Sequence, residues 1–290
     1  MSNQANPFSA GDSALGYLYQ CRLALWFALV RLRDLDDTDV AIESLDDVTF
    51  STDGKPTELL QTKHHLNTSA NLTDASPDLW KTLRIWASQL PLIQDGVRLF
   101  LLSTSAASSG SVAEMLQNGA GRDIAAAQKR LAEVLATSTN SENAAAYAAF
   151  NGLAPDHQLE LLDAVIVIDS SPNIVDVRHE IERELRLVVR QNQLAAFADR
   201  LEGWWYARVV RNLAKQDDGF ILGKELRSQI DDLRDQFRHD NLPTDFEDVF
   251  PDEDVIKAML GKPFVEQVRR SARQCWAMRR AVSPRNGLPD

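Results

Sequence analysis

Two short, uninterrupted apolar segments place the tightest limit on how this chain can fold. They are Val97–Thr104 (VRLFLLST) and Ala164–Asp169 (AVIVID), and a long stretch of helical periodicity separates them. A strand without polar alternation is buried on both faces, which is typical of the inner strands of a sheet covered by helices on each side. The sequence therefore predicts an α/β core.

The segments before these strands alternate between helix and strand patterns. Asp53-Gly54 is a strong signal for a tight turn between two antiparallel strands. Apolar residues at spacings of three and four predict helices on either side of this hairpin. The expected elements are a helix over Leu15–Arg33, strands over Val40–Glu43, Val48–Ser51 and Glu58–His64, and a helix over Asp74–Leu90.

Beyond Pro172 the pattern is helical throughout and predicts no strand. The expected helices are Val175–Val189, Gln193–Leu213, Gly223–Phe237 and Pro263–Ala281. We take this change of class as a domain boundary. The sequence thus predicts an α/β domain over residues 1–172 and an all-α domain over residues 173–290.

The net charge bears on what the protein binds, and the first residues bear on where it is located. The net charge of −11 and the pI near 5.0 disfavour bulk attraction to nucleic acid or to an anionic membrane. Met1–Gly11 is polar and unlike a secretory signal, and the apolar run Cys21–Val30 is too short to span a bilayer. We expect a cytoplasmic protein without a membrane anchor, in which Cys21 and Cys275 are free thiols.

The segment from Ile42 to His65 contains the residues that indicate chemistry. On the predicted second strand of the hairpin, Gln61 and Lys63 share one face. The hairpin brings Asp47 opposite this pair, and Glu43 ends the preceding strand. A carboxylate, an amide oxygen and a lysine would therefore converge on one small volume.

Oxygen ligands of this kind suit Mg²⁺, and a nearby lysine stabilises negative charge that develops on a phosphate. The arrangement predicts metal-assisted phosphodiester hydrolysis, with Mg²⁺ or alternatively Mn²⁺ as the cofactor. Asp47 precedes a (Glu/Gln)-x-Lys motif, the core of the PD-(D/E)xK nuclease signature. The spacing by itself favours Asp46, Asp47 and Lys63 being ordinary surface charges of a hairpin. Their placement on a hairpin between two amphipathic helices makes the two interpretations equally compatible with the sequence.

Several motifs in the N-terminal part resemble the double-stranded DNA endonuclease domain of bacterial antiphage systems, including CBASS nuclease effectors. The matching motifs are Gly16-Tyr17-x-Tyr19-Gln20, Ile42-Glu43, Asp46-Asp47-Val48, Leu60-Gln61-x-Lys63-His64 and Leu79-Trp80-Lys81-Thr82-Leu83. This resemblance implies a restriction-endonuclease-like fold, Mg²⁺ and cleavage of duplex DNA. Carried over by position, it makes Asp47, Gln61 and Glu43 the metal ligands and Lys63 the catalytic lysine. It makes Gln20, Asp46 and His64 supporting residues.

The C-terminal part resembles a different family, the C-terminal domain of ABC-three-component antiphage systems. The matching motifs are Leu201-Glu202-Gly203-Trp204-Trp205-Tyr206, Asp240-Asn241-Leu242-Pro243-x-Asp245-Phe246 and Phe264-Val265-x-Gln267. The resemblance implies contact with an SMC-like ATPase or another defence component, or a role in holding a homo-oligomer. Members usually continue for several more helices, so we expect a shortened domain.

Three further features have both a structural and a functional interpretation. Trp204-Trp205 favours a helical core over a docking surface. His64 is either a phosphate contact or a simple strand-end residue. The tail arginines are either a phosphate or partner face or a solvated helix face; they are Arg269, Arg270, Arg273, Arg279, Arg280 and Arg285.

Taken together, the sequence predicts a metal-dependent duplex DNA endonuclease that acts as an antiphage effector. A catalytically degenerate adaptor for an ATPase partner is the alternative, because Gln61 stands where a carboxylate would bind metal more strongly. RNA in place of DNA as the substrate is a further alternative.

Overall fold

The structure is a computed structural model that describes residues 10–34, 38–65 and 71–237, with isolated positions between 254 and 267. Contacts divide the chain into two compact units, Met1–Asn241 and Leu242–Asp290. Most of the second unit lies outside the described residues. So do the motif at 240–246, Phe264-Val265, Cys275, the arginines of the tail and most of the predicted helix over Pro263–Ala281.

The first unit is built on a five-stranded sheet with the order β1-β2-β3-β5-β7. Antiparallel pairing joins β1 to β2 and β2 to β3, whereas β3, β5 and β7 run parallel. The strands are β1 (Thr38–Ile42), β2 (Val48–Thr52), β3 (Lys55–Lys63), β5 (Arg98–Ser103) and β7 (Val165–Ile168). A two-stranded parallel sheet pairs β4 (Asn71–Leu72) with β6 (Ala106–Ala107). The predicted α/β class is therefore confirmed.

The tight turn between β2 and β3 is where the sequence predicts it. Asp53 and Gly54 have φ angles of 51° and 72°. Two successive residues with positive φ match the right-handed twist of a hairpin, and Gly54 adopts this conformation without a steric penalty. The turn pairs Thr52 with Lys55, and a register shift between Phe50 and Ser51 then places Val48 opposite Leu60.

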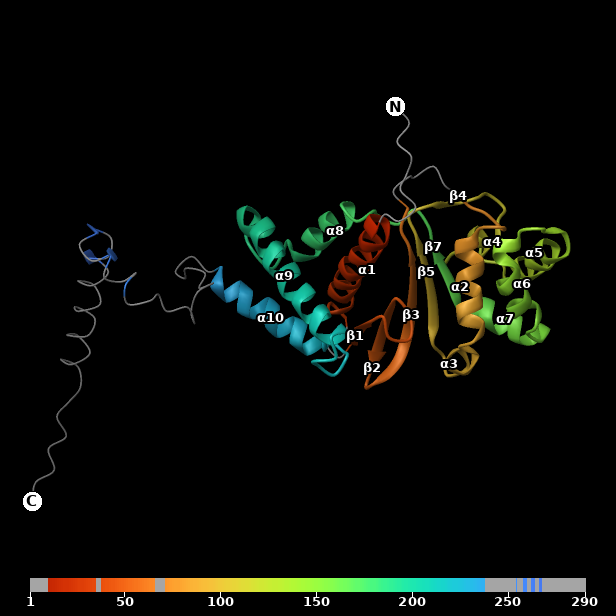
Figure 1. Ribbon diagram of the computed structural model, residues 1–290, viewed down its shortest axis with the longest axis horizontal. Helices are drawn as coiled ribbons and strands as arrows, with labels where there is room; N and C mark the ends of the chain where they lie inside the picture. The colour runs from red at the N-terminus through yellow and green to blue at the C-terminus, as the bar shows by residue number, and fades with distance from the viewer. Residues whose placement is uncertain are drawn as a thin grey trace, which may run out of the picture. The chain divides into compact units, whose positions relative to one another are not determined.

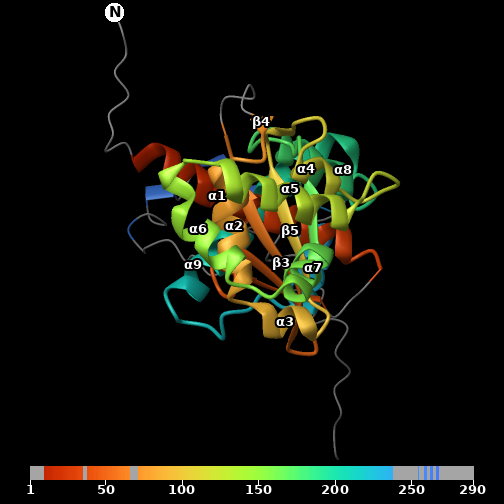
Figure 2. The ribbon, with the colours of Figure 1, turned by 90° about the vertical axis from the view of Figure 1, so that its right-hand side faces the viewer.

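Helices cover both faces of the sheet (Figure 1). One layer contains α1 (Ala10–Arg31), α8 (Asp176–Leu185), α9 (Leu194–Leu213) and α10 (Gly223–Gln236). The other layer, which faces the viewer in Figure 2, contains α2 (Pro77–Ala87), α3 (Leu90–Gln94), α4 (Val112–Met115), α5 (Ile124–Thr137), α6 (Ala144–Asn151) and α7 (Pro155–Ala164). Single 3₁₀ turns at Ser141–Asn143 and Gln191–Gln193 precede α6 and α9.

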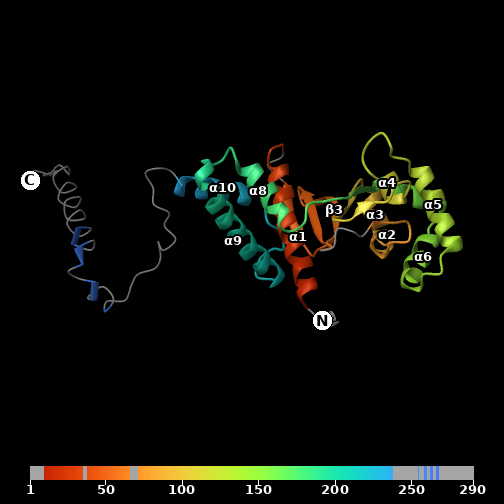
Figure 3. The same ribbon diagram turned by 90° about the horizontal axis from the view of Figure 1, so that it is seen from above.

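Two hydrophobic cores lie on opposite faces of the sheet, and neighbouring strand residues alternate between them. Leu60 packs in the core beneath α1, while Leu59 packs in the core beneath α2. On β5, Leu102 likewise packs in the core beneath α1 and Leu101 in the core beneath α2. This alternation follows from the period of two in a strand, and it confirms that the apolar run over 97–104 is buried on both faces. Figure 3 shows β3 between α1 and α2.

The compact unit does not end at residue 172, where the sequence indicates a boundary. Helices α8, α9 and α10 share one hydrophobic core with α1. Arg22 of α1 binds both carboxylate oxygens of Glu202 on α9, over 2.7 and 3.2 Å. The change of secondary-structure class is real, but long-range packing joins the two halves. The functional division into residues 1–172 and 173–290 stays a prediction.

Trp205 belongs to the core, as the sequence favours. Its side chain is fully buried, and its indole N–H donates to the backbone oxygen of Cys21 over 2.8 Å. Trp204 is half-buried and packs against the same core.

The region after residue 172 also contacts the sheet. Ile221 forms an isolated bridge with Val40 on β1. Among the described residues, no helix is both long and apolar enough to cross a membrane.

Candidate active site

The predicted site residues gather where β3 ends beside the start of β2. Asp46 and Asp47 immediately precede β2, while Gln61 and Lys63 lie near the end of β3. Because Val48 pairs with Leu60, Asp47 lies next to Gln61. The hairpin thus brings together residues that are 14 positions apart in the chain.

Asp47 is held firmly by β3. The backbone N–H and the hydroxyl of Thr62 donate to Oδ2 of Asp47 over 2.8 and 3.0 Å. The Gln61 side-chain amide donates to Oδ1 over 3.0 Å. Charge-assisted bonds of this kind fix a carboxylate in one orientation. Asp47 is therefore a preorganised carboxylate at the edge of the sheet.

Gln61 connects the acidic and basic parts of the site. Its side chain is buried, with 5% of the residue's surface exposed. Its Nε2 donates to both Asp46 and Asp47, and its Oε1 accepts from the Lys63 ammonium over 2.9 Å. Asp47, Gln61 and Lys63 therefore form one hydrogen-bonded chain. The structure brings these three predicted residues together, while their chemical roles stay predictions.

Asp46 lies deeper than Asp47 and is 7% exposed. The Trp86 indole N–H donates to its Oδ2 over 2.6 Å, and the Asp47 backbone N–H donates to its Oδ1 over 3.0 Å. Burial raises the pKa of Asp46 from 3.8 to about 6, although the bonds from Trp86 and Gln61 oppose this rise. The neighbouring charge of Asp47 raises the pKa of Asp46 further.

Glu43 directly follows β1 and is exposed. Its φ of 53° places it in the left-handed region, and its backbone N–H donates to the Asp47 carbonyl over 3.0 Å. Desolvation of the carboxyl, followed by the charge of Asp47, raises the pKa of Glu43. The two carboxylates therefore interact electrostatically. A shared cation would relieve this repulsion.

Gln20 has a less defined place. It lies on α1 between Tyr17 and Cys21, whose pKa values rise mainly through burial and in smaller part through the Glu43 charge. The buried Oε1 of Gln20 has no hydrogen-bond partner among the described residues. Helical spacing places Tyr17, Gln20 and Cys21 on a common side of α1. In the part of the chain that the structure describes, no hydrogen bond ties this oxygen to Asp47 or Gln61.

The two histidines after Lys63 differ in their surroundings. The His64 ring packs against Tyr19 with 4.6 Å between centroids, and its Nε2 accepts from the Ile174 backbone N–H over 3.4 Å. Burial, followed by the charge of His65, lowers the pKa of His64. These contacts favour the interpretation of His64 as a strand-end residue. His65 instead lies 2.6 Å from the Asp78 carboxylate.

Three side chains of this region are missing from the sequence prediction. Trp86 and Asp78 lie on α2, and the Thr62 hydroxyl lies between Gln61 and Lys63. Trp86 is part of the predicted apolar face, but apolar periodicity does not reveal the partner of an indole N–H. A buried tryptophan does require such a partner, and this requirement is the one available signal.

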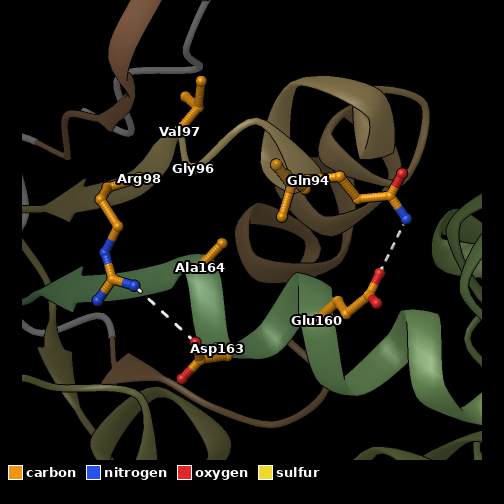
Figure 4. Close-up of a pocket in the computed structure, with 8 residues that line it drawn as sticks. Gln94, Gly96, Val97, Arg98, Glu160, Asp163 and Ala164 are labelled. Carbon is orange, nitrogen blue, oxygen red and sulfur yellow. Dashed lines mark hydrogen bonds and ion pairs between the residues drawn. The ribbon is translucent and has the colours of Figure 1, made fainter.

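A second polar region lies at the opposite end of the sheet (Figure 4). Here a cavity of about 510 Å³ is lined by Ile93, Gln94, Gly96, Val97, Arg98, Glu160, Asp163 and Ala164. Arg98 begins β5 and pairs with Glu58, whereas Lys63 pairs with Ser103 at the end of β5. Exposed polar pairs cross the cavity, with 3.9 Å between Arg98 and Asp163 and 3.1 Å between Gln94 and Glu160.

The donors near Asp47 fit a hard cation in their chemistry. Asp47, Glu43 and Gln61 offer two carboxylates and an amide oxygen, the types of ligand that Mg²⁺ prefers. Among the described residues, no group of three or more His, Cys, Asp and Glu side chains is arranged to hold a metal. A metal site here therefore depends on the Gln61 amide, on backbone oxygens and on water.

Comparisons with known proteins give limited information. No family model matches this chain, and no curated protein matches it either. Among solved structures, it is similar to the Cap4 SAVED/CARF-domain containing receptor of Moraxella osloensis, with 17% identity and a TM-score of 0.47. That match covers 80% of this chain and 54% of the receptor.

The Cap4 receptor of Acinetobacter baumannii is similar at 15% identity with a TM-score of 0.45, covering 77% of this chain and 48% of the receptor. Another structure of that receptor contains the cyclic trinucleotide 2'3'3'-cAAA. This chain spans about half the length of these proteins. Likeness at this level establishes neither a restriction-endonuclease-like core nor a shared activity.

Proposed function

We propose that this chain is a Mg²⁺-dependent endonuclease that hydrolyses duplex DNA in a bacterial antiphage defence system. The observation that carries the proposal is the hydrogen-bonded chain from Asp47 through Gln61 to Lys63 at the end of β3. The defence role rests on the sequence motifs that resemble antiphage nuclease effectors. The net charge of −11 supports DNA engagement that depends on metal, oligomerisation or a partner.

Each residue has a role that follows from its contacts. Lys63 presents an ammonium that Gln61 holds in place, and this charge stabilises the negative charge that develops on the phosphate. Asp47, Glu43 and Gln61 would hold the cation through oxygen atoms. A bound Mg²⁺ would supply Lewis acidity and would lower the pKa of a coordinated water. In the hydrolysis, a water oxygen bonds to phosphorus as one phosphorus–oxygen ester bond breaks, and one proton of the water passes through solvent to the departing ester oxygen.

The test uses the full chain with duplex DNA and duplex RNA of the same sequence. We expect Mg²⁺ or Mn²⁺ to support cleavage of the DNA and EDTA to stop it. Cleavage of the RNA alone would replace DNA by RNA as the substrate. Cleavage of DNA that is unchanged in EDTA would contradict the metal dependence.

A non-catalytic adaptor is the second candidate, and one observation favours it. Both Asp47 oxygens and the Gln61 Oε1 already accept bonds from protein donors. An adaptor built on this hairpin would retain the network without binding metal. Calorimetric titration with Mn²⁺ separates the two functions, since heat that Asp47→Ala abolishes supports the nuclease. Absence of such heat supports the adaptor.

The region after residue 172 supports a further part of the proposal. Its resemblance to ABC-three-component proteins points to an SMC-like ATPase partner or to a homo-oligomer. Light scattering of the purified chain tests the oligomer directly. A monomer at all concentrations would leave the ATPase as the partner to test by co-purification of the two proteins.

A further inference from the structure

The Gln61 amide lies between two carboxylates, and this position restricts which residue can occupy it. Its Nε2 donates to Oδ1 of Asp46 and to Oδ1 of Asp47. A neutral amide nitrogen has two protons, and both are used here. A carboxylate at position 61 would bring a third acceptor without a proton. Buried acceptors that face one another without a donor are strongly destabilising.

The orientation of the amide is also determined by its neighbours. Lys63 donates to Oε1 of Gln61 over 2.9 Å. If the amide rotated by half a turn, its oxygen would face Asp46 and Asp47, and its nitrogen would face the Lys63 ammonium. Both contacts would be repulsive. Only one of the two amide orientations is therefore compatible with these surroundings.

Asp46 is the part of these surroundings that cannot move aside. It is buried, and it accepts from the Trp86 indole at 2.6 Å and from the Asp47 backbone N–H at 3.0 Å. Trp86 is itself fully buried in the core beneath α2. The position of the Gln61 amide is thus connected through Asp46 to the hydrophobic core.

We propose that Asp46, held by Trp86, is a positioning residue that orients the Gln61 amide and makes an amide the required group at position 61. The proposal rests on the proposed function in one respect, because the oriented Gln61 oxygen is the one that would serve the metal. It explains why the site has Gln where the motif also allows Glu. It also predicts that exchanging the two groups restores the hydrogen bond between positions 46 and 61, although the bond from position 61 to Asp47 is lost.

A double-mutant cycle tests this coupling without reference to activity. The variants are Gln61→Glu, Asp46→Asn and the two together, and urea unfolding gives the unfolding constant of each. In the double variant, the new amide at position 46 can accept from Trp86 through its oxygen and donate through its nitrogen to the new carboxylate at position 61. We expect the unfolding constant of the double variant to be at least about tenfold smaller than the value obtained by multiplying the effects of the two single variants.

The control pairs Gln61→Glu with Asp163→Asn at the opposite end of the sheet. No described residue hydrogen-bonds to both of these side chains, so we expect their effects on the unfolding constant to multiply. The proposal would be overturned if the effects on the unfolding constant multiplied for both pairs of variants, or failed to multiply for both. If a single variant does not fold, the side-chain amide resonances of Gln61 give the answer, because Trp86→Phe removes the donor that holds Asp46 and should shift them, whereas Asp163→Asn should not. Unchanged Gln61 resonances in Trp86→Phe would overturn the proposal.

Activity provides the second readout. We expect both single variants to lose cleavage and the double variant to regain it, since the carboxylate introduced at position 61 again offers an oriented oxygen. If the wild-type chain does not cleave DNA but the unfolding constants are coupled, the proposed function fails and the positioning role stands. If the chain cleaves DNA and the unfolding effects simply multiply, the positioning role fails.

Discussion

The two ends of the parallel sheet present polar groups in very different ways. At the end of β3, Asp46 and Gln61 are buried and hydrogen-bonded to each other, and Asp46 also accepts from the Trp86 indole. At the start of β5, Arg98 and Asp163 are exposed, lie 3.9 Å apart and border an open cavity. Burying polar groups is costly unless every group is satisfied. This contrast is the reason for proposing the end of β3, and not the cavity, as the functional site.

The cavity is therefore a weaker indication of function than the network. The Arg98–Asp163 pair can be screened by water and salt, so it contributes little to stability. The Arg98 and Asp163 side chains are exposed and can change without disturbing the core. The residues around Gln61 cannot, because each one completes the hydrogen bonding of another. The predictions below test this difference, beginning with the largest expected effect.

Trp86 provides the strongest test of the buried end. Trp86→Ala should lower the free energy of unfolding by about 4 kcal/mol, because it leaves a cavity and removes the donor to Asp46. Trp86→Phe keeps most of the packing and should cost about 2 kcal/mol, mostly through the lost bond to a charged group. Urea unfolding of both variants separates packing from hydrogen bonding. Equal stability of Trp86→Phe and wild type would contradict the role of the indole N–H.

The pH dependence of stability gives the next largest effect. The pKa of Asp46 is about 6 in the folded chain, above its ordinary 3.8. The folded state therefore holds this proton more tightly than the unfolded chain. The stabilising contribution is complete below the ordinary pKa of 3.8 and is lost as the pH rises through about 6. By linkage, the loss amounts to at most about 3 kcal/mol.

Asp46→Asn removes this titration and so isolates its contribution from that of the other carboxylates. Relative to wild type, the variant should gain stability between about pH 4 and about pH 6. Urea unfolding in EDTA across this range measures the difference. A difference that does not change with pH would show that Asp46 titrates normally.

The open end of the sheet should tolerate the corresponding changes. Arg98→Ala and Asp163→Ala each remove one member of an exposed pair, so each should change the free energy of unfolding by less than about 0.5 kcal/mol. The same urea experiment measures both. A loss above about 2 kcal/mol for either variant would remove the contrast between the two ends.

Much of the architecture follows from local patterns. Asp53-Gly54 predicts the hairpin, and the hairpin, together with the register shift between Phe50 and Ser51, places Asp47 beside Gln61. The apolar runs over 97–104 and 164–169 predict two strands that are indeed buried in the sheet. These features depend on a period or a turn type, which neighbouring residues determine.

Features that depend on distant partners were not predictable in this way. The bond from Trp86 to Asp46 joins residues 40 positions apart, and the bond from Arg22 to Glu202 joins residues 180 positions apart. Periodicity shows that Trp86 faces a core, but not which carboxylate its N–H meets. For the same reason, the class change at residue 172 indicates a boundary that packing between α1 and α9 overrides.

The most direct test of the account compares three forms of the full chain on supercoiled duplex DNA with Mg²⁺. The wild type should convert the plasmid to nicked and linear forms. Lys63→Ala should reduce the rate by about 100-fold or more, because it removes the charge that stabilises the developing phosphate anion. Arg98→Ala, at the open end of the sheet, should cleave as the wild type does. Equal cleavage by wild type and Lys63→Ala, with both chains folded, would contradict the account.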